Sequence, residues 1–357
     1  RQFGQHNEFK SGFLINSHHV IENRWAAFPR IADKFGNLVG YAGTHFDADF
    51  ADGGFYVQDK MEYPGFVLSG GLRLDLYQAE SPMPDIWNNP FRPDLYGHFM
   101  RETFLDSLDV ISAEVPLKMA FSPRLGIAHP ISEVSKLFFN YGHFTQSPTT
   151  HNLYWLRYGG IGSGGRMEFV GNAWLPLPKT VSYELGYEHD FWRRAHLNLS
   201  GYYKDARNQA QFVWYNPGTA ESMWFSYQDY SYWTMKGLEG NLTTRNNRFV
   251  NGFINFSYFF TTFGTTGPTL VRPDDEELHN NQINEQAMGI AKQNFEPVIR
   301  AKSGINFSLP TDFGPSLGNN HPLGDWHINL IIKWKQGAKF HWDPTHLSDE
   351  STLNYKW

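Results

Sequence analysis

The chain contains no cysteine, which excludes disulfide bonds and metal sites built on thiolates. It also has no uninterrupted apolar run near the roughly 20 residues that a membrane-spanning helix needs. Basic residues do not dominate, because 30 Lys and Arg stand against 36 Asp and Glu. A general nucleic-acid-binding protein would carry a basic stripe, so we expect no nucleic-acid partner.

Aromatic residues are abundant instead, at 17% of the chain, although the mean hydropathy is only −0.48. A chain this aromatic is not disordered. Its apolar residues recur at every second position. In residues 195–205, for example, Leu197, Leu199 and Tyr203 alternate with polar neighbours such as His196 and Lys204. A period of two is typical of a β-strand with one apolar face.

Eleven segments follow this pattern, and each is about ten residues long, which is the length a tilted strand needs to cross a bilayer. The segments are residues 8–18, 55–63, 66–78, 117–128, 136–144, 181–189, 195–205, 233–243, 250–260, 298–309 and 326–335.

The connections between these segments alternate between short and long. Tight turns occupy residues 64–65, 129–135, 190–194 and 244–248, and the connection 310–325 is of middle length. The long connections are residues 21–54, 79–116, 145–180, 208–232 and 261–297. In an up-and-down antiparallel sheet this sorting places all long loops at one end, as in outer-membrane barrels. We therefore predict an all-β fold, an antiparallel transmembrane up-and-down β-barrel.

One charge does not fit the predicted lipid-facing side. Asp59 lies in phase with Phe55, Val57, Met61 and Tyr63. A carboxylate among lipid-facing side chains is unfavourable. A β-bulge after Val57 would turn Asp59 towards the inside. Without such a bulge, Asp59 counts against the barrel prediction.

Several stretches resemble the barrel of TonB-dependent receptors. They are Gly53–Tyr77, "FSPRLGIAHPISEVSKLFFNYGHFTQSP" at Phe121–Pro148, "YELGYEHDF" with "LNLSGYYKDARN", "MKGLEGNL" with "NGFINFSYFF", and "LIIKWKQGAKF" at Leu330–Phe340. The similarity covers nearly the whole chain outside the long loops. It is nearest to the large receptors of Bacteroidota, including Oar-like ones.

The resemblance implies a barrel of about 22 strands around a plug domain, of which residues 1–357 would supply about 11–13 strands of one C-terminal barrel domain. The plug domain, its TonB box and the terminal strands are expected outside this sequence. It also implies a place in the outer membrane of a Gram-negative bacterium, in contact with outer-membrane lipid.

The implied activity is import of a scarce nutrient, a siderophore, cobalamin, or an oligosaccharide or peptide. The TonB–ExbB–ExbD complex would supply the energy, and a surface lipoprotein is a further expected partner. We find no catalytic constellation, so we expect neither an enzyme nor a cofactor. Two alternatives stay open: a barrel that acts as a structural or assembly partner in a larger envelope complex, and a soluble all-β carbohydrate-binding protein.

Aromatic residues in the long loops are candidate ligand contacts, because flat rings suit sugars or aromatic siderophores. The alternative is that they pack the loops together or form an aromatic belt. The candidates are Trp155, Tyr158, Trp174, Trp214, Tyr215 and Trp224, with Phe225 and Tyr227 beside them.

A weak metal candidate lies in "DADFADGG", with Asp47, Asp49 and Asp52. Ala51 and Asp52 stand where a calcium loop of the EF-hand type needs an oxygen ligand and glycine. We therefore expect a solvated acidic loop here and no metal.

Overall fold

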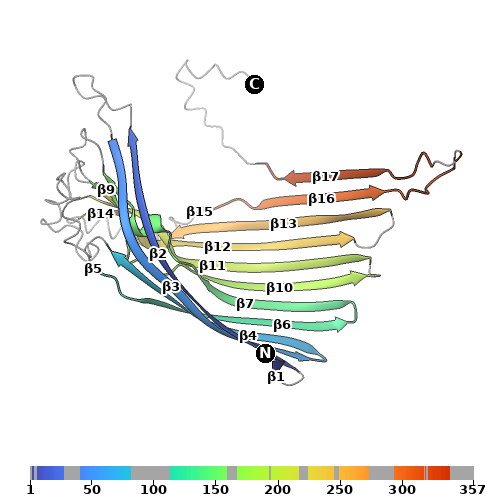
Figure 1. Ribbon diagram of the computed structural model, residues 1–357, viewed down its shortest axis with the longest axis horizontal. Helices are drawn as coiled ribbons and strands as arrows, with labels where there is room; N and C mark the ends of the chain where they lie inside the picture. The colour runs from blue at the N-terminus through green and yellow to red at the C-terminus, as the bar shows by residue number, and fades with distance from the viewer. Residues whose placement is uncertain are drawn as a thin grey trace, which may run out of the picture.

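The computed structural model describes residues 2–3, 6–27, 41–81, 113–158, 167–192, 194–216, 224–244, 249–272, 293–316, 318 and 321–337. In this part of the chain nearly all backbone belongs to one large antiparallel sheet (Figure 1). Among the helices described, none is long and apolar enough to span a membrane.

Eleven strands of nine residues or more form the body of the sheet. They are β2 (Asn7–Ala27), β3 (Tyr41–Tyr63), β4 (Phe66–Ser81), β6 (Lys118–Ser132), β7 (Ser135–Thr145), β10 (Lys179–Phe191), β11 (Ala195–Tyr215), β12 (Trp224–Thr244), β13 (Val250–Thr265), β16 (Val298–Ser308) and β17 (His327–Lys335). Each pairs antiparallel with the next one in the chain. The predicted up-and-down order is confirmed, and all eleven predicted segments are strands.

Short elements lie in the longer connections. They are β1 (Gln2–Phe3), β5 (Ala113–Glu114), α3 (Thr150–Tyr154), β8 (Leu156–Tyr158), β9 (Met167–Val170), β14 (Leu270–Val271) and β15 (Gln293–Asn294).

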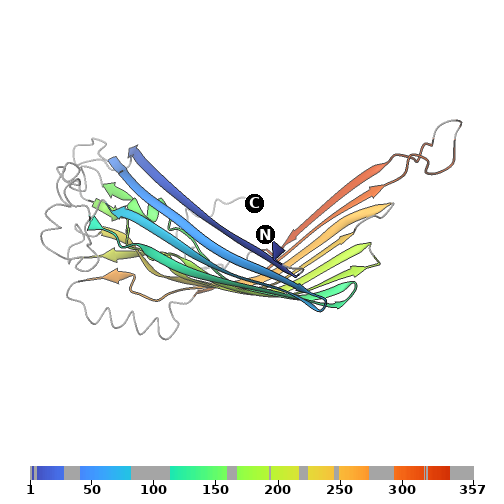
Figure 2. The same ribbon diagram turned by 60° about the horizontal axis from the view of Figure 1, so that its bottom comes forward.

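The sheet is curved into a trough, with β2 near one edge and β17 at the other (Figure 2). The hairpins with short connections, such as β3–β4 and β6–β7, turn at one end, and β9 lies at the opposite end (Figure 1). There β8 pairs with β9, directly after α3 in the chain. By analogy with known barrels, we refer to the first as the periplasmic end and the second as the extracellular end.

The alternation of the sequence becomes two chemically different faces. On β3 and β4, Phe55 lies opposite Leu74 on one face, and Tyr56 lies opposite Arg73 on the other. Large apolar side chains on the first face are open to the surroundings; Phe13 and Ile15 are 79% and 78% exposed. Only a lipid environment accommodates such a surface without penalty. This apolar face is the outside of the trough, and the polar face is its inside.

The buried core lies at the extracellular end and not along the trough. Phe46, Tyr77, Val115, Leu153 and Tyr154 are each at most 2% exposed there. They come from β3, β4, the segment before β6, and α3. The connection between β7 and β10 therefore folds down onto the tops of strands that are distant in sequence.

Two long connections are shorter than predicted. The loop expected at residues 21–54 is wrong, because β2 continues to Ala27 and β3 already begins at Tyr41. The loop expected at 208–232 is likewise wrong, since β11 runs to Tyr215 and β12 begins at Trp224. Beyond the bilayer the outer face no longer needs apolar residues, so the strands continue without an alternation that the sequence could reveal.

β3 has no bulge that would turn Asp59 inward. β3 keeps an unbroken register with both β2 and β4, in which Asp59 lies opposite Phe9 and Gly70. Asp59 therefore stays on the apolar face, and its Oδ1 is buried without a hydrogen-bond partner among the described residues. Its place only four residues from Tyr63, at the periplasmic end of β3, keeps it away from the middle of the bilayer, where a charge costs most.

Candidate ligand-binding site

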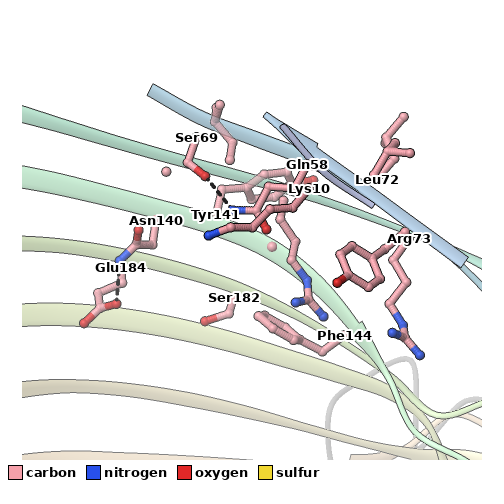
Figure 3. A pocket seen from close by; sticks show the side chains of 17 residues that line it. Lys10, Gln58, Ser69, Leu72, Arg73, Asn140, Tyr141, Phe144, Ser182 and Glu184 are labelled. Atoms are coloured by element: carbon pink, nitrogen blue, oxygen red, sulfur yellow. Dashed lines mark hydrogen bonds between the residues drawn. The ribbon is translucent and has the colours of Figure 1, made fainter. Parts of the chain in front are cut away.

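The inside of the trough carries a polar cavity of about 710 Å³ (Figure 3). Side chains from six strands line it, because the same alternation sends every second residue of each strand inward. The lining includes Arg73, Arg124, Phe144 and Glu184.

Most charges in the cavity are paired. Arg73 Nε donates to Asp75 Oδ1 at 2.6 Å, and the Thr145 hydroxyl donates to the other oxygen of Asp75 at 2.6 Å. Asn140 donates to Glu184 Oε2 at 3.1 Å. These contacts hold the side chains of the inner wall in place, and the resulting polar wall suits another polar surface or a polar ligand.

Arg124 differs from these paired groups. Its guanidinium lies 4.9 Å from the centre of the Phe144 ring, and no carboxylate pairs with it among the residues that the structure describes. A cation held over a ring in this way keeps its hydrogen-bond donors available. Arg124 is therefore the cation of this cavity whose donors are open to an incoming anionic group.

The connection between β7 and β10 forms a cap over the extracellular end. Thr149 starts α3, its hydroxyl accepting from the backbone N–H of Asn152 at 3.3 Å. The N–H of Gly171 donates to the carbonyl of Trp155 at 2.6 Å. A Cβ at Gly171 would lie 2.6 Å from the backbone of Leu153, so only glycine permits this close approach.

Buried polar groups fasten the cap to the strands. Asn172 Nδ2 donates to the carbonyl of Tyr227 at 2.8 Å, and its Oδ1 accepts from the N–H of Trp174 at 2.9 Å. The Ser226 hydroxyl donates to the carbonyl of Val170 at 2.7 Å. Satisfied buried polar groups of this kind specify one arrangement of the cap, because losing a partner would be costly.

Two of the predicted ligand aromatics pack against each other. The rings of Tyr215 and Trp224 stack with centroids 4.2 Å apart and planes 12° apart, and they are only 5% and 4% exposed. They join β11 to β12 beyond the bilayer. A ligand has little access to either ring as the structure stands.

Four aromatic rings form a row that runs from Trp155 to Trp214. Trp155 stacks on Phe169 at 4.5 Å, Phe169 stacks on Phe225 at 4.7 Å, and Trp214 contacts Phe225 at 3.7 Å. We call Trp155, Phe169, Phe225 and Trp214 the aromatic row. Trp214, at its end, is 41% exposed and offers a face to a ligand.

The other two candidates have different surroundings. Trp174 packs against the buried core of the cap. Tyr158 ends β8, and its side chain lies outside the described residues.

Sequence reasoning missed Phe169 and Phe212. Phe212 meets Phe169 edge-on at 5.9 Å, lies 4.5 Å from Tyr227, and is 40% exposed. The local sequence pattern does not predict that these rings belong to the site. Phe169 reaches it because β9 pairs parallel with β12, which places Phe169 opposite Phe225.

The acidic candidates do not converge. They lie within β3 and not in a loop. Because side chains alternate along the strand, Asp47 and Asp49 lie on the outer face of the trough and Asp52 lies on its inner face. His19 Nδ1 lies 2.8 Å from Asp49 Oδ1, and His18 Nε2 lies 2.7 Å from Asp52 Oδ1. No group of three or more His, Asp or Glu able to hold a metal occurs in the described part of the chain.

An antiparallel meander with an apolar outer face and a polar inner wall is the arrangement of part of a transmembrane β-barrel. Residues 2–352 match the family model for the TonB dependent receptor-like β-barrel. The chain belongs to this family, whose members are transport receptors in the outer membrane of Gram-negative bacteria. That location excludes the soluble alternative. No curated protein matches the chain.

Solved structures with similar folds include the FrpB iron transporter from Neisseria meningitidis, at 10% identity and a TM-score of 0.45, with 94% of this chain and 46% of that one covered. The Serratia marcescens hemophore receptor HasR, solved with its hemophore HasA and heme, has 14% sequence identity and a TM-score of 0.48, with 84% of this chain and 50% of that one covered. The ferric enterobactin receptor PfeA from Pseudomonas aeruginosa, solved with enterobactin, has 13% sequence identity and a TM-score of 0.43, with 84% of this chain and 46% of that one covered. The chain thus spans about half the length of these structures.

Proposed function

We propose that this chain forms part of the barrel of an importer that carries a scarce nutrient across the outer membrane. A siderophore, cobalamin, and an oligosaccharide or peptide are the candidate classes. Family membership supports the transport role. The observation that supports ligand capture is a pair of exposed rings at the extracellular end: Trp214, at the end of the aromatic row, is 41% exposed, and Phe212 beside the row is 40% exposed.

The aromatic row suits capture because it is held rigidly from behind. Phe225 contacts both Phe169 and Trp214, and Phe212 leans on the buried Tyr227. A ring fixed in place before binding loses little conformational entropy when a ligand stacks on it. We propose that Trp214 and Phe212 stack on a sugar ring or an aryl group of the ligand.

Tyr215 and Trp224 then support this platform from the neighbouring positions of β11 and β12. Trp155 anchors the other end of the row, and Trp174 holds the cap. We keep Tyr158 as a further candidate contact.

We also propose that the inner wall faces a plug domain. A polar wall with paired charges is complementary to a polar protein surface, and Arg124 would pair with a carboxylate on the plug or on a passing ligand. The TonB–ExbB–ExbD complex would then supply energy through a TonB box on the plug. A surface lipoprotein over the cap is a further proposed partner.

Binding to the full-length receptor tests ligand capture. Quenching of tryptophan fluorescence would be titrated with three probes: a ferric tris-catecholate, cobalamin and a maltooligosaccharide. We expect one probe to bind and Trp214→Ala to weaken its affinity about fivefold, from the loss of roughly 1 kcal/mol of stacking. Phe212→Ala should have a similar effect.

Trp192→Phe is the matched control, because Trp192 is 87% exposed but lies in the β10–β11 turn at the periplasmic end. It should leave the affinity unchanged. If Trp214→Ala and Phe212→Ala bound the probe as tightly as this control, the platform would be rejected.

Uptake of the same probe by cells separates transport from a role in assembly. We expect accumulation to stop when either the receptor gene or the tonB gene is deleted. Accumulation that continues without the receptor, together with loss of an envelope complex in its absence, would favour the structural or assembly role.

A further inference from the structure

A lysine occupies the lipid-facing side of β12. Lys236 lies in a cross-strand row with Tyr203 on β11 and Phe260 on β13, and Tyr203 lies opposite Tyr183 on β10. All are on the apolar face. Lys236 is exposed, and its Nζ lies 5.4 Å from the centre of the Tyr203 ring and 5.7 Å from that of Phe260. Among the described residues it makes no ion pair.

The height of Lys236 places its ammonium near the outer leaflet's headgroups. Lys236 is eight residues from Thr244, which ends β12 at the periplasmic side. Eight residues span about 26 Å along a strand, and a tilt of about 40° reduces this to roughly 20 Å along the membrane normal. The apolar band of such barrels is about 25 Å tall. An extended lysine side chain is long enough to bring the ammonium across the remaining distance.

More positive charge lies just above. Lys179 on β10 faces Arg207 on β11 directly across the strands, on the same apolar side as Tyr183 and Tyr203. Arg207 Nε donates to Asp205 Oδ2 at 3.0 Å, and its guanidinium lies 5.1 Å from the centre of the Tyr232 ring. With Lys236 this makes three cations against one carboxylate. The excess is two positive charges at the level where lipid phosphates lie.

An apolar groove lies on the same face beside Lys236. It has a volume of about 480 Å³, and its lining includes Leu185, Gly201, Leu238, Tyr258 and Lys236. The groove depends on Gly201, because a Cβ there would come within 3.2 Å of Leu238 Cδ2. A groove that is apolar along its length and basic at its upper side matches an acyl chain attached to a phosphorylated headgroup.

We propose that this surface is a specific binding site for a phosphate-bearing lipid of the outer leaflet. Lys236 binds the phosphate, with Lys179 and Arg207 within the same basic patch, and one acyl chain lies in the groove over Gly201. The occupant is a lipid and not a free anion, because the apolar groove and the cation share one continuous surface.

Native mass spectrometry of the full-length, delipidated receptor in detergent tests this site. Lipid A carrying its phosphates would be titrated against dephosphorylated lipid A and inorganic phosphate. We expect the phosphorylated lipid to bind roughly fivefold more tightly than the dephosphorylated one. Lys236→Leu should remove this difference, and Lys236→Arg should preserve it. Gly201→Leu, which fills the groove, should weaken both lipids.

Lys204→Leu is the matched control, since Lys204 also lies over a tyrosine ring, 5.0 Å from Tyr202, but on the inner wall of β11. It should bind both lipids as the unmodified receptor does. Folding of every variant would be checked by its heat-modifiable mobility on gels. Unchanged lipid selectivity in Lys236→Leu, or unchanged affinity in Gly201→Leu, would overturn the proposal. Binding of inorganic phosphate as tight as that of the lipid, and equally lost in Lys236→Leu, would assign the site to free anions instead.

Discussion

The ring of Phe138 lies against Gly186, its direct partner on the neighbouring strand, so that a Cβ on Gly186 would come within 2.1 Å of the Phe138 Cζ atom. Tyr202 covers Gly237 in the same way on β11 and β12. Glycine inside a strand usually weakens it. Here each glycine provides the space in which an aromatic ring packs onto the backbone of the adjacent strand.

Gly186→Ala should therefore destabilise the barrel. The added methyl group forces Phe138 out of its position, and overpacking of this kind costs about 1–3 kcal/mol. Urea unfolding of the full-length receptor in lipid vesicles would measure the change. Gly70→Ala is the control, because nothing lies within 4 Å of a Cβ at Gly70. Equal stability of the two variants would show that Phe138 moves aside without cost.

Trp224→Ala should loosen the extracellular end while leaving the transmembrane strands folded. The substitution removes a ring that is 4% exposed and stacked on Tyr215, and loss of a buried aromatic ring costs about 3–5 kcal/mol locally. We expect faster cleavage of β11 and β12 by external protease on intact cells, with unchanged heat-modifiable mobility. Trp214→Ala, at the exposed end of the aromatic row, should be cleaved no faster than the unmodified receptor.

The cap should lose stability at high pH. Burial raises the pKa of Tyr154 from about 10 to about 12, and the carboxylates of Glu80 and Asp49 act in the same direction. The neutral phenol is therefore favoured in the folded cap. Its stabilisation is complete below about pH 10 and is lost as the pH rises through about 12.

Tyrosinate absorbance measures this directly. The difference between the titrations of the unmodified receptor and Tyr154→Phe should show one phenol with a midpoint near 12. A midpoint near 10 would mean that Tyr154 is solvated and that the cap is open in solution.

Asp59→Leu should stabilise the protein. Asp59 lies on the apolar face with one carboxylate oxygen buried and unpaired among the described residues. Leucine there would add lipid contact and remove the cost of placing a charge beside lipid, for a gain of about 1 kcal/mol. Urea unfolding in vesicles would report it. A loss of stability would reveal a cation partner for Asp59 in the whole receptor.

Local sequence patterns were sufficient for the strands inside the bilayer. Lipid requires apolar side chains at alternate positions, so segments such as 195–205 and 326–335 carry their strand assignment in their own residues. Outside the bilayer that requirement ends. The prediction missed that Asp47, Trp214 and Trp224 lie in strands. At these positions the strands are held by their pairing partners and by the cap, and these contacts leave no alternation of apolar and polar residues in the sequence.

The sequence by itself determined the fold class, the direction of each strand and the side on which each loop lies, because lipid requires apolar residues at every second position of a spanning strand. The family came from the resemblance of stretches such as Phe121–Pro148 to TonB-dependent receptor barrels, and the family model confirms it. Only the tertiary structure decided which loop aromatics are buried and which are open, that Asp59 stays on the apolar face, and that Lys236 lies beside an apolar groove. Those features depend on register between strands distant in the chain, which sets the neighbours of each side chain.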